Sequence, residues 1–233
     1  MAREEPGTLH CRAVQVADKD ELRALHQACF PITYEEAFYE KVVHLADGIS
    51  CFVASTCSNQ LVGFITARTT AVHGDARDLL LPDLCGATTR RCACYILTLG
   101  VAPDWRRTGV ASQLLQLVLD RCQASPSCQL VYLHTLTTNA ASLGLYTKHH
   151  AFRIAATERG FYVIRGEHAP TPGVCHYDAH VLCRYINGGR PPLRALGGVM
   201  GSALASSSTW GVIGASASAL HRLWDRMVFL LSG

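Results

Sequence analysis

Hydrophobic and polar positions recur with two different spacings between residues 10 and 190, and both strands and helices are predicted from them. Alternation or short apolar runs predict strands at 10–16, 50–56, 61–70, 94–101, 129–136, 152–157 and 177–186. A helical spacing predicts helices at 18–29, 34–44, 110–121 and 140–148. The strand–helix–strand order between 94 and 136 implies a parallel pair with a right-handed crossover. We therefore expect an α/β fold with a mixed central sheet flanked by helices.

Short polar signals divide these elements. Asp18, followed three residues later by Glu21, predicts a capping box at the start of a helix, and Asn139 predicts another N-cap. Residues 71–91 are polar and interrupted by glycine and proline, so we expect a loop there. We expect a turn around 161–162, between the last two strands.

The chain changes character after residue 193. Residues 195–220 carry no charge, and Leu220–Leu231 then place large apolar residues on one helical face and charged residues opposite. This pattern is typical of a helix lying in a membrane interface. A packed accessory element and a membrane-spanning helix are the alternatives, although the serines and threonine at 206–209 weaken a span. We divide the chain into a domain of residues 1–190 and a C-terminal membrane-associating amphipathic segment, 191–233.

Composition excludes several function classes. The chain has 233 residues and a formal net charge of only +3, without the clustered basic residues that nucleic-acid binding requires. Its eleven cysteines are odd in number and contain no C-x-x-C pair, so they predict neither a disulfide framework nor a zinc site. The opening MAREEPGTLH is polar and acidic, unlike a signal peptide. We expect free or buried thiols in a reducing compartment and no metal.

The stretch VAPDWRRTGVASQLL, residues 101–115, joins a buried strand to an amphipathic helix. A helix N-terminus presents N–H groups without helical partners and a partial positive charge, so it attracts anions. Gly109 allows a diphosphate to approach the main chain, and Arg106 and Arg107 add charge. The turn lacks the G-K-[ST] of a phosphate-binding P-loop. Taken alone, it also fits an ordinary strand-to-helix turn with exposed arginines.

Four segments together resemble the GNAT superfamily of acetyl-CoA-dependent N-acetyltransferases: YILTLGV (95–101), RRTGVA (106–111), LHTLTTNAASLGLY (133–146) and GFYVIRG (160–166). In that superfamily an R/Q-x-x-G-x-G/A loop, matched here by 106–111, cradles the CoA pyrophosphate. FPITY (30–34), YINGGRPP (185–192) and GSALAS (201–206) further resemble the membrane-associated Nα-terminal acetyltransferases of the NatF type. The resemblance spans residues 10–206 and implies a GNAT fold.

The resemblance implies acetyl-CoA as cosubstrate. The thioester and pantetheine would be held by the main chain of Leu99, Gly100 and Val101, where an N–H is also the natural oxyanion donor. The remaining cofactor contacts that it implies are Arg107, Thr108, Gly109, Val110, Ala111 and Ser112 at the pyrophosphate, and Asn139, Tyr146, Thr147, Lys148 and His149 farther along.

Tyr95 and His134 match the positions of the family's catalytic tyrosine and histidine. A histidine titrates at about 6.5 and can serve as a general base at cellular pH, whereas a tyrosine titrates at about 10. We therefore expect His134 to accept the proton through a water that Tyr95 orients. Without the resemblance, a tyrosine opening a buried strand and a strand histidine would more simply be structural. His149, His150 and His221 are expected at the surface without a catalytic role.

The peptide slot implied by the resemblance consists of Phe30, Pro31, Ile32, Tyr34, Leu97 and Tyr162. Its apolar lining suits an initiator methionine, and its tyrosines can bind a peptide main chain. The sequence departs from NatF-type enzymes at Thr33, where they have glutamate, and at Phe161, where they have tyrosine. Loss of that glutamate favours apolar second residues over basic ones.

These observations predict an Nα-acetyltransferase acting on Met-starting N-termini (Met-Lys, Met-Leu, Met-Ile and Met-Phe types). Its partners would be the N-termini of transmembrane proteins and the membrane surface, and the chain would be a monomer or weak dimer. The expected location is the cytosolic face of an organelle, such as the Golgi, or of the plasma membrane. A lysine or histone Nε-acetyltransferase and a non-catalytic acetyl-CoA-binding membrane adaptor are the alternatives.

Overall fold

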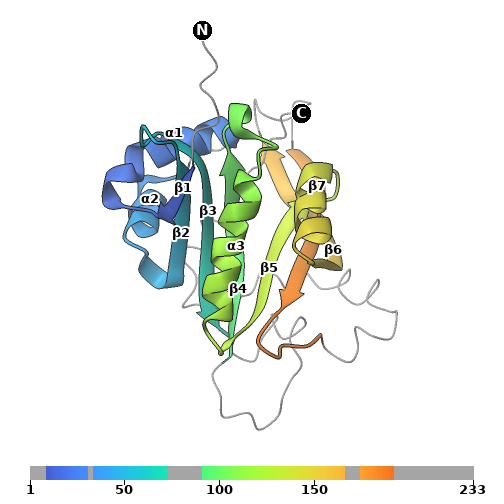
Figure 1. Ribbon diagram of the computed structural model, residues 1–233. Helices are drawn as coiled ribbons and strands as arrows, with labels where there is room; N and C mark the ends of the chain where they lie inside the picture. Colours follow the sequence, from blue (N-terminus) through green and yellow to red (C-terminus); the bar gives the residue numbers. More distant parts are fainter. Residues whose placement is uncertain (1–8, 31–33, 73–90, 166–173, 192–233) are drawn as a thin grey trace. The chain divides into compact units, whose positions relative to one another are not determined.

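The computed structural model describes residues 9–30, 34–72, 91–165 and 174–191, which fall into two compact units. Unit 1 takes in residues 1–69 and 94–124, and unit 2 takes in residues 70–93 and 125–233. Figure 1 shows the elements in sequence colours.

Unit 1 contains four strands in the order β1-β2-β3-β4, with the paired strands β1/β2 and β2/β3 antiparallel. Its three helices occur at the predicted places. The bounds are β1 (His10–Ala13), η1 (Val16–Asp18), α1 (Lys19–Cys29), α2 (Glu36–Val43), η2 (Ala46–Gly48), β2 (Ile49–Ser55), β3 (Leu61–Ala71), β4 (Cys92–Val101), η4 (Pro103–Trp105) and α3 (Val110–Gln123).

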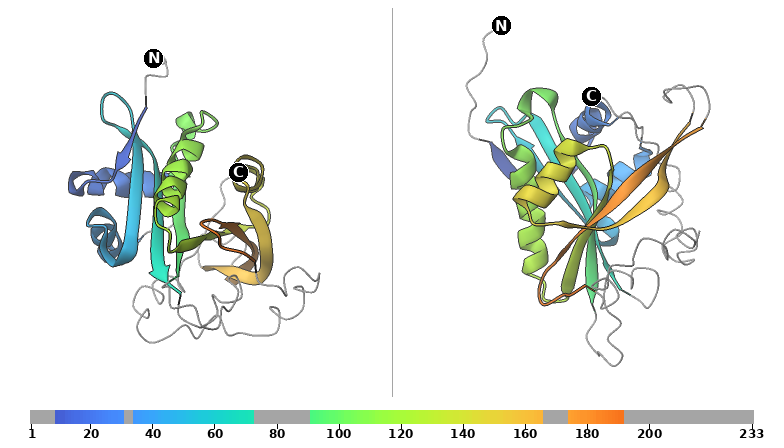
Figure 2. Two further views of the ribbon diagram at one scale, coloured as in Figure 1. Left: turned by 60° about the horizontal axis from the view of Figure 1, so that its bottom comes forward. Right: turned by 90° about the vertical axis from the view of Figure 1, so that its right-hand side faces the viewer.

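The strands of unit 1 have helices on both faces, α1 and α2 on one and α3 on the other (Figures 1 and 2). Two neighbouring residues of β3 show this arrangement. The Phe64 ring lies 4.0 Å from the ring of His26 on α1. At Gly63, a Cβ atom would come within 2.8 Å of Val110 and 3.1 Å of Leu114 on α3. Successive strand residues point to opposite faces, so Gly63 allows α3 to approach the sheet closely.

The predicted capping box at Asp18 is wrong. Asp18 lies in η1. Its carboxylate accepts hydrogen bonds from both terminal guanidinium nitrogens of Arg12, at 2.6 and 2.8 Å, and from the Gln15 N–H at 2.7 Å. Arg12 holds the pKa of Asp18 below its usual range. Glu21 instead accepts the N–H of Leu61 at 2.7 Å. Both carboxylates are therefore bound to other partners, Asp18 to Arg12 and Gln15 just before the helix and Glu21 to Leu61 on β3.

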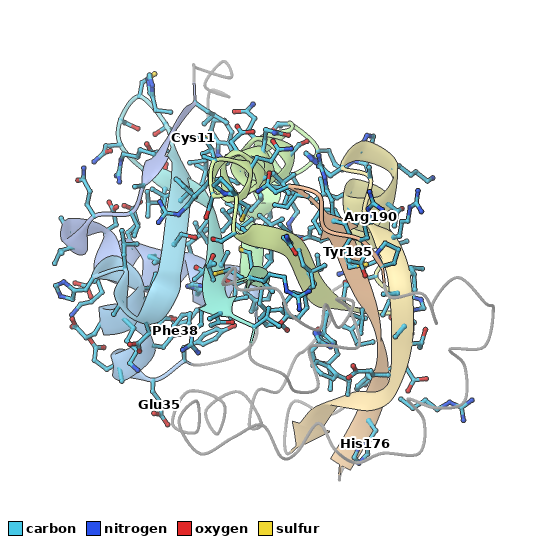
Figure 3. All side chains as sticks on the ribbon, turned by 90° about the horizontal axis from the view of Figure 1, so that it is seen from below. Cys11, Glu35, Phe38, His176, Tyr185 and Arg190 are labelled. Carbon is cyan, nitrogen blue, oxygen red and sulfur yellow. The ribbon has the colours of Figure 1, made fainter. Side chains whose placement is uncertain are left out.

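Unit 2 contains three strands in the order β5-β7-β6 with antiparallel pairs β5/β7 and β6/β7. The bounds are β5 (Cys128–Leu136), α4 (Ala140–Leu143), η5 (Gly144–His149), β6 (Arg153–Arg165) and β7 (Val174–Tyr185). The labelled His176 and Tyr185 mark the two ends of β7 (Figure 3). The register pairs His134 with Val181 and Leu136 with Ala179.

The turn predicted around 161–162 is also wrong, because both residues lie inside the long strand β6. The pairing of β6 with β7 shifts between Glu158 and Tyr162, which is a bulge in a continuous strand. Gly160 lies in the bulge with φ of +61°, and its N–H donates to Asp178 at 2.8 Å. The chain therefore continues through 161–162 as a strand with a local irregularity at Gly160.

The predicted helix at 140–148 forms as one α-helical turn, α4, continued by the π-helical η5. Its predicted N-cap is confirmed, since the Asn139 side chain accepts the Ser142 N–H at 3.0 Å. His150, expected at the surface, is 7% exposed, and Arg184 donates to its main-chain carbonyl. Burial lowers the pKa of His150. His149 is exposed as expected.

Several expectations fall outside the described residues: most of the 71–91 loop, Pro31, Ile32, Thr33, His221 and the segment beyond residue 191. Among the described residues, no helix is long and apolar enough to cross a membrane. The first predicted strand is shorter than expected and ends at Ala13, where η1 soon begins.

Candidate active site

The turn that precedes α3 has the conformation that its sequence suggested. Gly109 is the N-cap of α3 with φ of +92°, and Arg107 also has a positive φ, of +66°. The Thr108 hydroxyl donates to the Trp105 carbonyl at 2.6 Å, and Arg106 Nε donates to the Val101 carbonyl at 3.2 Å. These bonds fix the turn from within, while Arg107 and Gly109 stay exposed.

The main chain at the start of α3 is open to an anion. A Cβ atom built on Gly109 would meet nothing within 4 Å. The next residues, Val110, Ala111 and Ser112, make up the first helical turn and come before Gln113, whose N–H donates to the Gly109 carbonyl at 3.0 Å. An open glycine, a helix N-terminus and the exposed Arg107 together fit a diphosphate group.

The end of β4 adjoins this turn in unit 1. Burial alternates along the strand, with Tyr95, Leu97, Leu99 and Val101 half-buried between fully buried neighbours. Gly100 is required by packing, because a Cβ there would lie 2.5 Å from the Phe64 ring and 3.1 Å from Cys29. Burial raises the pKa of the Cys29 thiol, and the neighbouring Arg106 opposes this rise.

A buried histidine connects the described parts of the predicted peptide slot in unit 1. His26 is fully buried, and its ring lies 6.2 Å from that of Phe30 and 5.2 Å from that of Tyr34. Its Nε2 atom lies 3.3 Å from the Thr98 hydroxyl on β4. Burial lowers the pKa of His26 to about 3, so the ring is neutral. The helical spacing of Leu22, Leu25 and Cys29 already placed residue 26 on the apolar face, a signal that was missed.

Tyr34 is 8% exposed, and its ring stacks on Phe38 at 4.5 Å. Its hydroxyl has no hydrogen-bond partner among the described residues, and burial raises its pKa. A buried hydroxyl of this kind is normally satisfied by protein, water or a bound group. The role of Tyr34 in binding a peptide main chain stays a prediction. The labelled Phe38 is drawn in Figure 3.

In unit 2, the predicted catalytic histidine and slot tyrosine are joined through Phe161. The rings of His134 and Phe161 are parallel, 4.0 Å apart with 2° between their planes. Phe161 meets Tyr162 edge-on at 4.8 Å. Tyr162 is 6% exposed and packs with Leu136, Ala179 and Tyr177. The bulge in β6 allows two consecutive aromatic residues to reach this face.

Glu158 is a residue of this group that the sequence did not suggest. Its Oε1 atom lies 3.5 Å from His134 Nε2, and the two side chains are 13% and 6% exposed. The two residues are 24 positions apart and on strands separated by β7, so no local pattern could have paired them.

The remaining predicted cofactor residues lie around α4 and η5 in unit 2. Tyr146 is buried against Phe152, with 5.3 Å between ring centroids, and Thr147 donates to the Leu143 carbonyl at 2.7 Å. Lys148 and His149 are exposed. The Ser142 hydroxyl accepts from Thr135 at 3.0 Å, which fixes α4 on the β5 face opposite His134.

Known proteins identify the fold. The profile of the Acetyltransferase (GNAT) family matches residues 19–152, more than half of the sequence. This chain belongs to the GNAT family. The predicted α/β GNAT fold, with a mixed central sheet flanked by helices, is confirmed. The family uses acetyl-CoA, so the prediction of an acetyl-CoA-dependent acyltransferase is confirmed as well.

Two relatives are similar to this chain over more residues than the family match covers. The chain is 31% identical over 219 residues to N-alpha-acetyltransferase 60 of Xenopus tropicalis, covering 89% of this chain and 85% of the relative. It is 32% identical over 195 residues to a protein of Arabidopsis thaliana named histone acetyltransferase MCC1, covering 81% of this chain and 74% of that one. The predicted likeness to Nα-terminal acetyltransferases is confirmed.

A solved structure supports the same relationship. The crystal structure of Arabidopsis thaliana NAA60 in complex with acetyl-CoA matches with a TM-score of 0.67 and 30% identity, covering 78% of this chain and all of that chain. A second structure of that protein contains a bisubstrate analogue, with a TM-score of 0.66. Among the described residues, no cluster of three or more His, Cys, Asp or Glu side chains could hold a metal ion.

Proposed function

We propose that this protein transfers the acetyl group of acetyl-CoA to the α-amine of protein N-termini, with a preference for those that begin with methionine. The observation that carries the proposal is the similarity to N-alpha-acetyltransferase 60 along 89% of the chain. The open turn at Gly109 and the buried group around His134 supply the chemistry that the transfer requires.

Acetyl-CoA supplies the acetyl group as a thioester. In this proposal the first turn of α3 binds the diphosphate through main-chain N–H groups, and the exposed Arg107 adds charge. The main chain of Leu99, Gly100 and Val101 binds the pantetheine and donates to the thioester oxygen, where negative charge develops during transfer. Lys148 and His149 are exposed cations or donors available to the rest of the cofactor.

Transfer forms a bond between the amine nitrogen and the acetyl carbon and breaks the carbon–sulfur bond. The amine loses a proton, and the leaving thiolate gains one. His134 accepts the amine proton through a water in this proposal, and Tyr95 orients that water or protonates the thiolate. Both roles come from the matching positions in the GNAT family.

The choice of an α-amine has a simple acid–base reason. At neutral pH about one α-amine in ten is neutral, against fewer than about one lysine side chain in a thousand. Phe30 and Tyr34, which pack around neutral His26, give an apolar surface for a methionine side chain. In this proposal the Tyr34 hydroxyl, which is buried without a partner among the described residues, bonds to the substrate main chain. Because Thr33 carries no charge, we expect apolar second residues to be preferred.

Initial rates on paired peptides test this proposal. Met-Leu peptides should be acetylated, and blocking their α-amine beforehand should abolish product formation. The relative named histone acetyltransferase favours one other candidate, acetylation of lysine side chains. Activity that survives α-amine blocking on a lysine-containing peptide would support that candidate and contradict ours.

The C-terminal segment supports a proposal about where the protein is located in the cell. The uncharged stretch 195–220 and the amphipathic Leu220–Leu231 suit a helix that rests on a membrane surface with its apolar side buried. We infer peripheral attachment on the cytosolic face of an organelle, such as the Golgi, or of the plasma membrane. Its substrates would then be cytosol-facing N-termini of transmembrane proteins.

A further inference from the structure

Glu158 lies close to His134 because of the strand register of unit 2. His134 on β5 is opposite Val181 on β7, and Glu158 on β6 is opposite Ala179, two residues earlier on the same strand. Residues two apart on a strand point to the same face, so both side chains project from one side of the sheet. Their Nε2 and Oε1 atoms are 3.5 Å apart.

Both members of this pair are shielded from water. The side chains of His134 and Glu158 are 6% and 13% exposed, and the Phe161 ring covers one face of the imidazole. Charges that are shielded from water interact more strongly than exposed ones. A separation of 3.5 Å is longer than a formed hydrogen bond, as is common for catalytic contacts before substrate binds.

We propose that Glu158 is a positioning residue for His134: its carboxylate orients the imidazole and stabilises the positive charge that the ring acquires when it accepts the amine proton. This inference rests on the proposed function, in which His134 is the base. The carboxylate favours the protonated ring, and the parallel Phe161 ring also favours a cation above its face. Glu158 itself takes up no proton in this step.

Glu158→Gln tests the proposal, because glutamine keeps the size of the side chain and removes its charge. A positioning residue acts on the chemical step, so kcat should fall by about tenfold, a part of the ~10²–10⁴-fold that a general base contributes. KM for acetyl-CoA and for the peptide should stay within about twofold. The matched control is Asp120→Asn, which removes an exposed carboxylate from α3, where its partner is Gln116. Its kcat should match the wild type.

A double-mutant cycle separates this inference from the proposed function. If Glu158 acts through His134, Glu158→Gln should have no further effect on kcat in a His134→Gln background. Wild-type activity of His134→Gln itself would overturn the base assignment. A slow His134→Gln variant together with a fully active Glu158→Gln variant would overturn the positioning role alone.

Two other outcomes also decide against the proposal. Multiplicative losses in the double variant would mean that Glu158 acts independently of His134. An increase in peptide KM at unchanged kcat would make Glu158 a substrate-binding residue. Glu158→Asp keeps the charge and guards against a folding defect in Glu158→Gln. Its kcat should lie between those of the wild type and Glu158→Gln, and a kcat no better than that of Glu158→Gln would contradict a role for the charge.

Discussion

The imidazole ring of His134 lies parallel to the phenyl ring of Phe161, with 4.0 Å between the centroids. The stack fixes the plane of the residue to which we assign the proton transfer. It also gives a structural role to Phe161, which is not among the site residues predicted from the sequence.

Replacing Phe161 by alanine should lower kcat by roughly tenfold, because a misaligned base is costly even when it stays in place. Phe161→Tyr keeps the ring and should retain wild-type kcat. Steady-state kinetics with a Met-Leu peptide measures both. Ile154→Ala is the control, since Ile154 is a large apolar residue on the same strand and is 51% exposed. Equal rates for Phe161→Ala and Ile154→Ala would remove the stack from the mechanism.

Gly109→Ala should raise KM for acetyl-CoA. No atom lies within 4 Å of the added methyl group, so the effect comes from φ of +92°, which costs an alanine about 1–2 kcal/mol. Relief of that strain would move the N–H groups of the first turn of α3. An increase of roughly 5- to 30-fold in KM is expected if the whole cost appears in binding.

Gly144→Ala is the matched control for Gly109→Ala. An added methyl there also meets nothing within 4 Å, but its φ of −61° is helical. We expect it to leave the KM for acetyl-CoA unchanged. If Gly109→Ala also leaves that KM unchanged, the anion does not bind at the start of α3.

His26 should make the fold sensitive to acid. Its pKa is about 3 in the folded protein because of burial, against 6.5 for a free histidine. Between these values the unfolded chain binds a proton that the native ring refuses, so stability is full above pH 6.5 and falls as the pH drops toward 3. The expected loss from this one group is about 1.4 kcal/mol per pH unit inside that window.

Urea unfolding between pH 7 and pH 4 measures this loss, and His26→Gln isolates it because glutamine does not titrate in this range. His150, whose pKa is also lowered by burial, contributes to both proteins and cancels in the difference. The wild type should therefore lose stability more steeply than the variant. Identical slopes would show that His26 is protonated in the native state.

Deleting residues 191–233 should release the protein from membranes. The apolar face of Leu220–Leu231 would be lost with its attached segment, and each large apolar side chain contributes about 1.5–3 kcal/mol when fully buried. Sedimentation of cell extracts measures the distribution, with full-length protein as the control. Acetylation of peptides by the shortened protein should be unchanged. A shortened protein that still sediments with membranes would refute the anchor.

The sequence predicted the elements of this fold well wherever one spacing dominates. The apolar runs at 94–101 and 129–136 became β4 and β5, and Asn139 formed the expected N-cap. Competing partners caused the error at the first helix. Asp18 and Glu21 have the spacing of a capping box, but Asp18 bonds to Arg12 and Gln15 just before it, and Glu21 bonds to Leu61, which only the folded chain brings near.

The residues of the candidate site also differ in whether the sequence could predict them. The turn at Gly109 could be predicted from local sequence, because a glycine between an apolar strand and a helix indicates a tight turn at the start of the helix. Glu158 could not, because its contact with His134 depends on the register of three strands and on the bulge that follows it. At residues 161–162, where we expected a turn, the bulged strand instead carries the aromatic pair that packs beside His134.

The most direct test of the whole account uses one peptide with both kinds of amine. A Met-Leu peptide carrying an internal lysine is incubated with acetyl-CoA and the enzyme, and tandem mass spectrometry locates the acetyl group. We predict acetylation at the α-amine of methionine, with the lysine side chain unmodified. Acetyl groups found on the lysine while the α-amine stays free would contradict Nα-acetylation as the function of this protein.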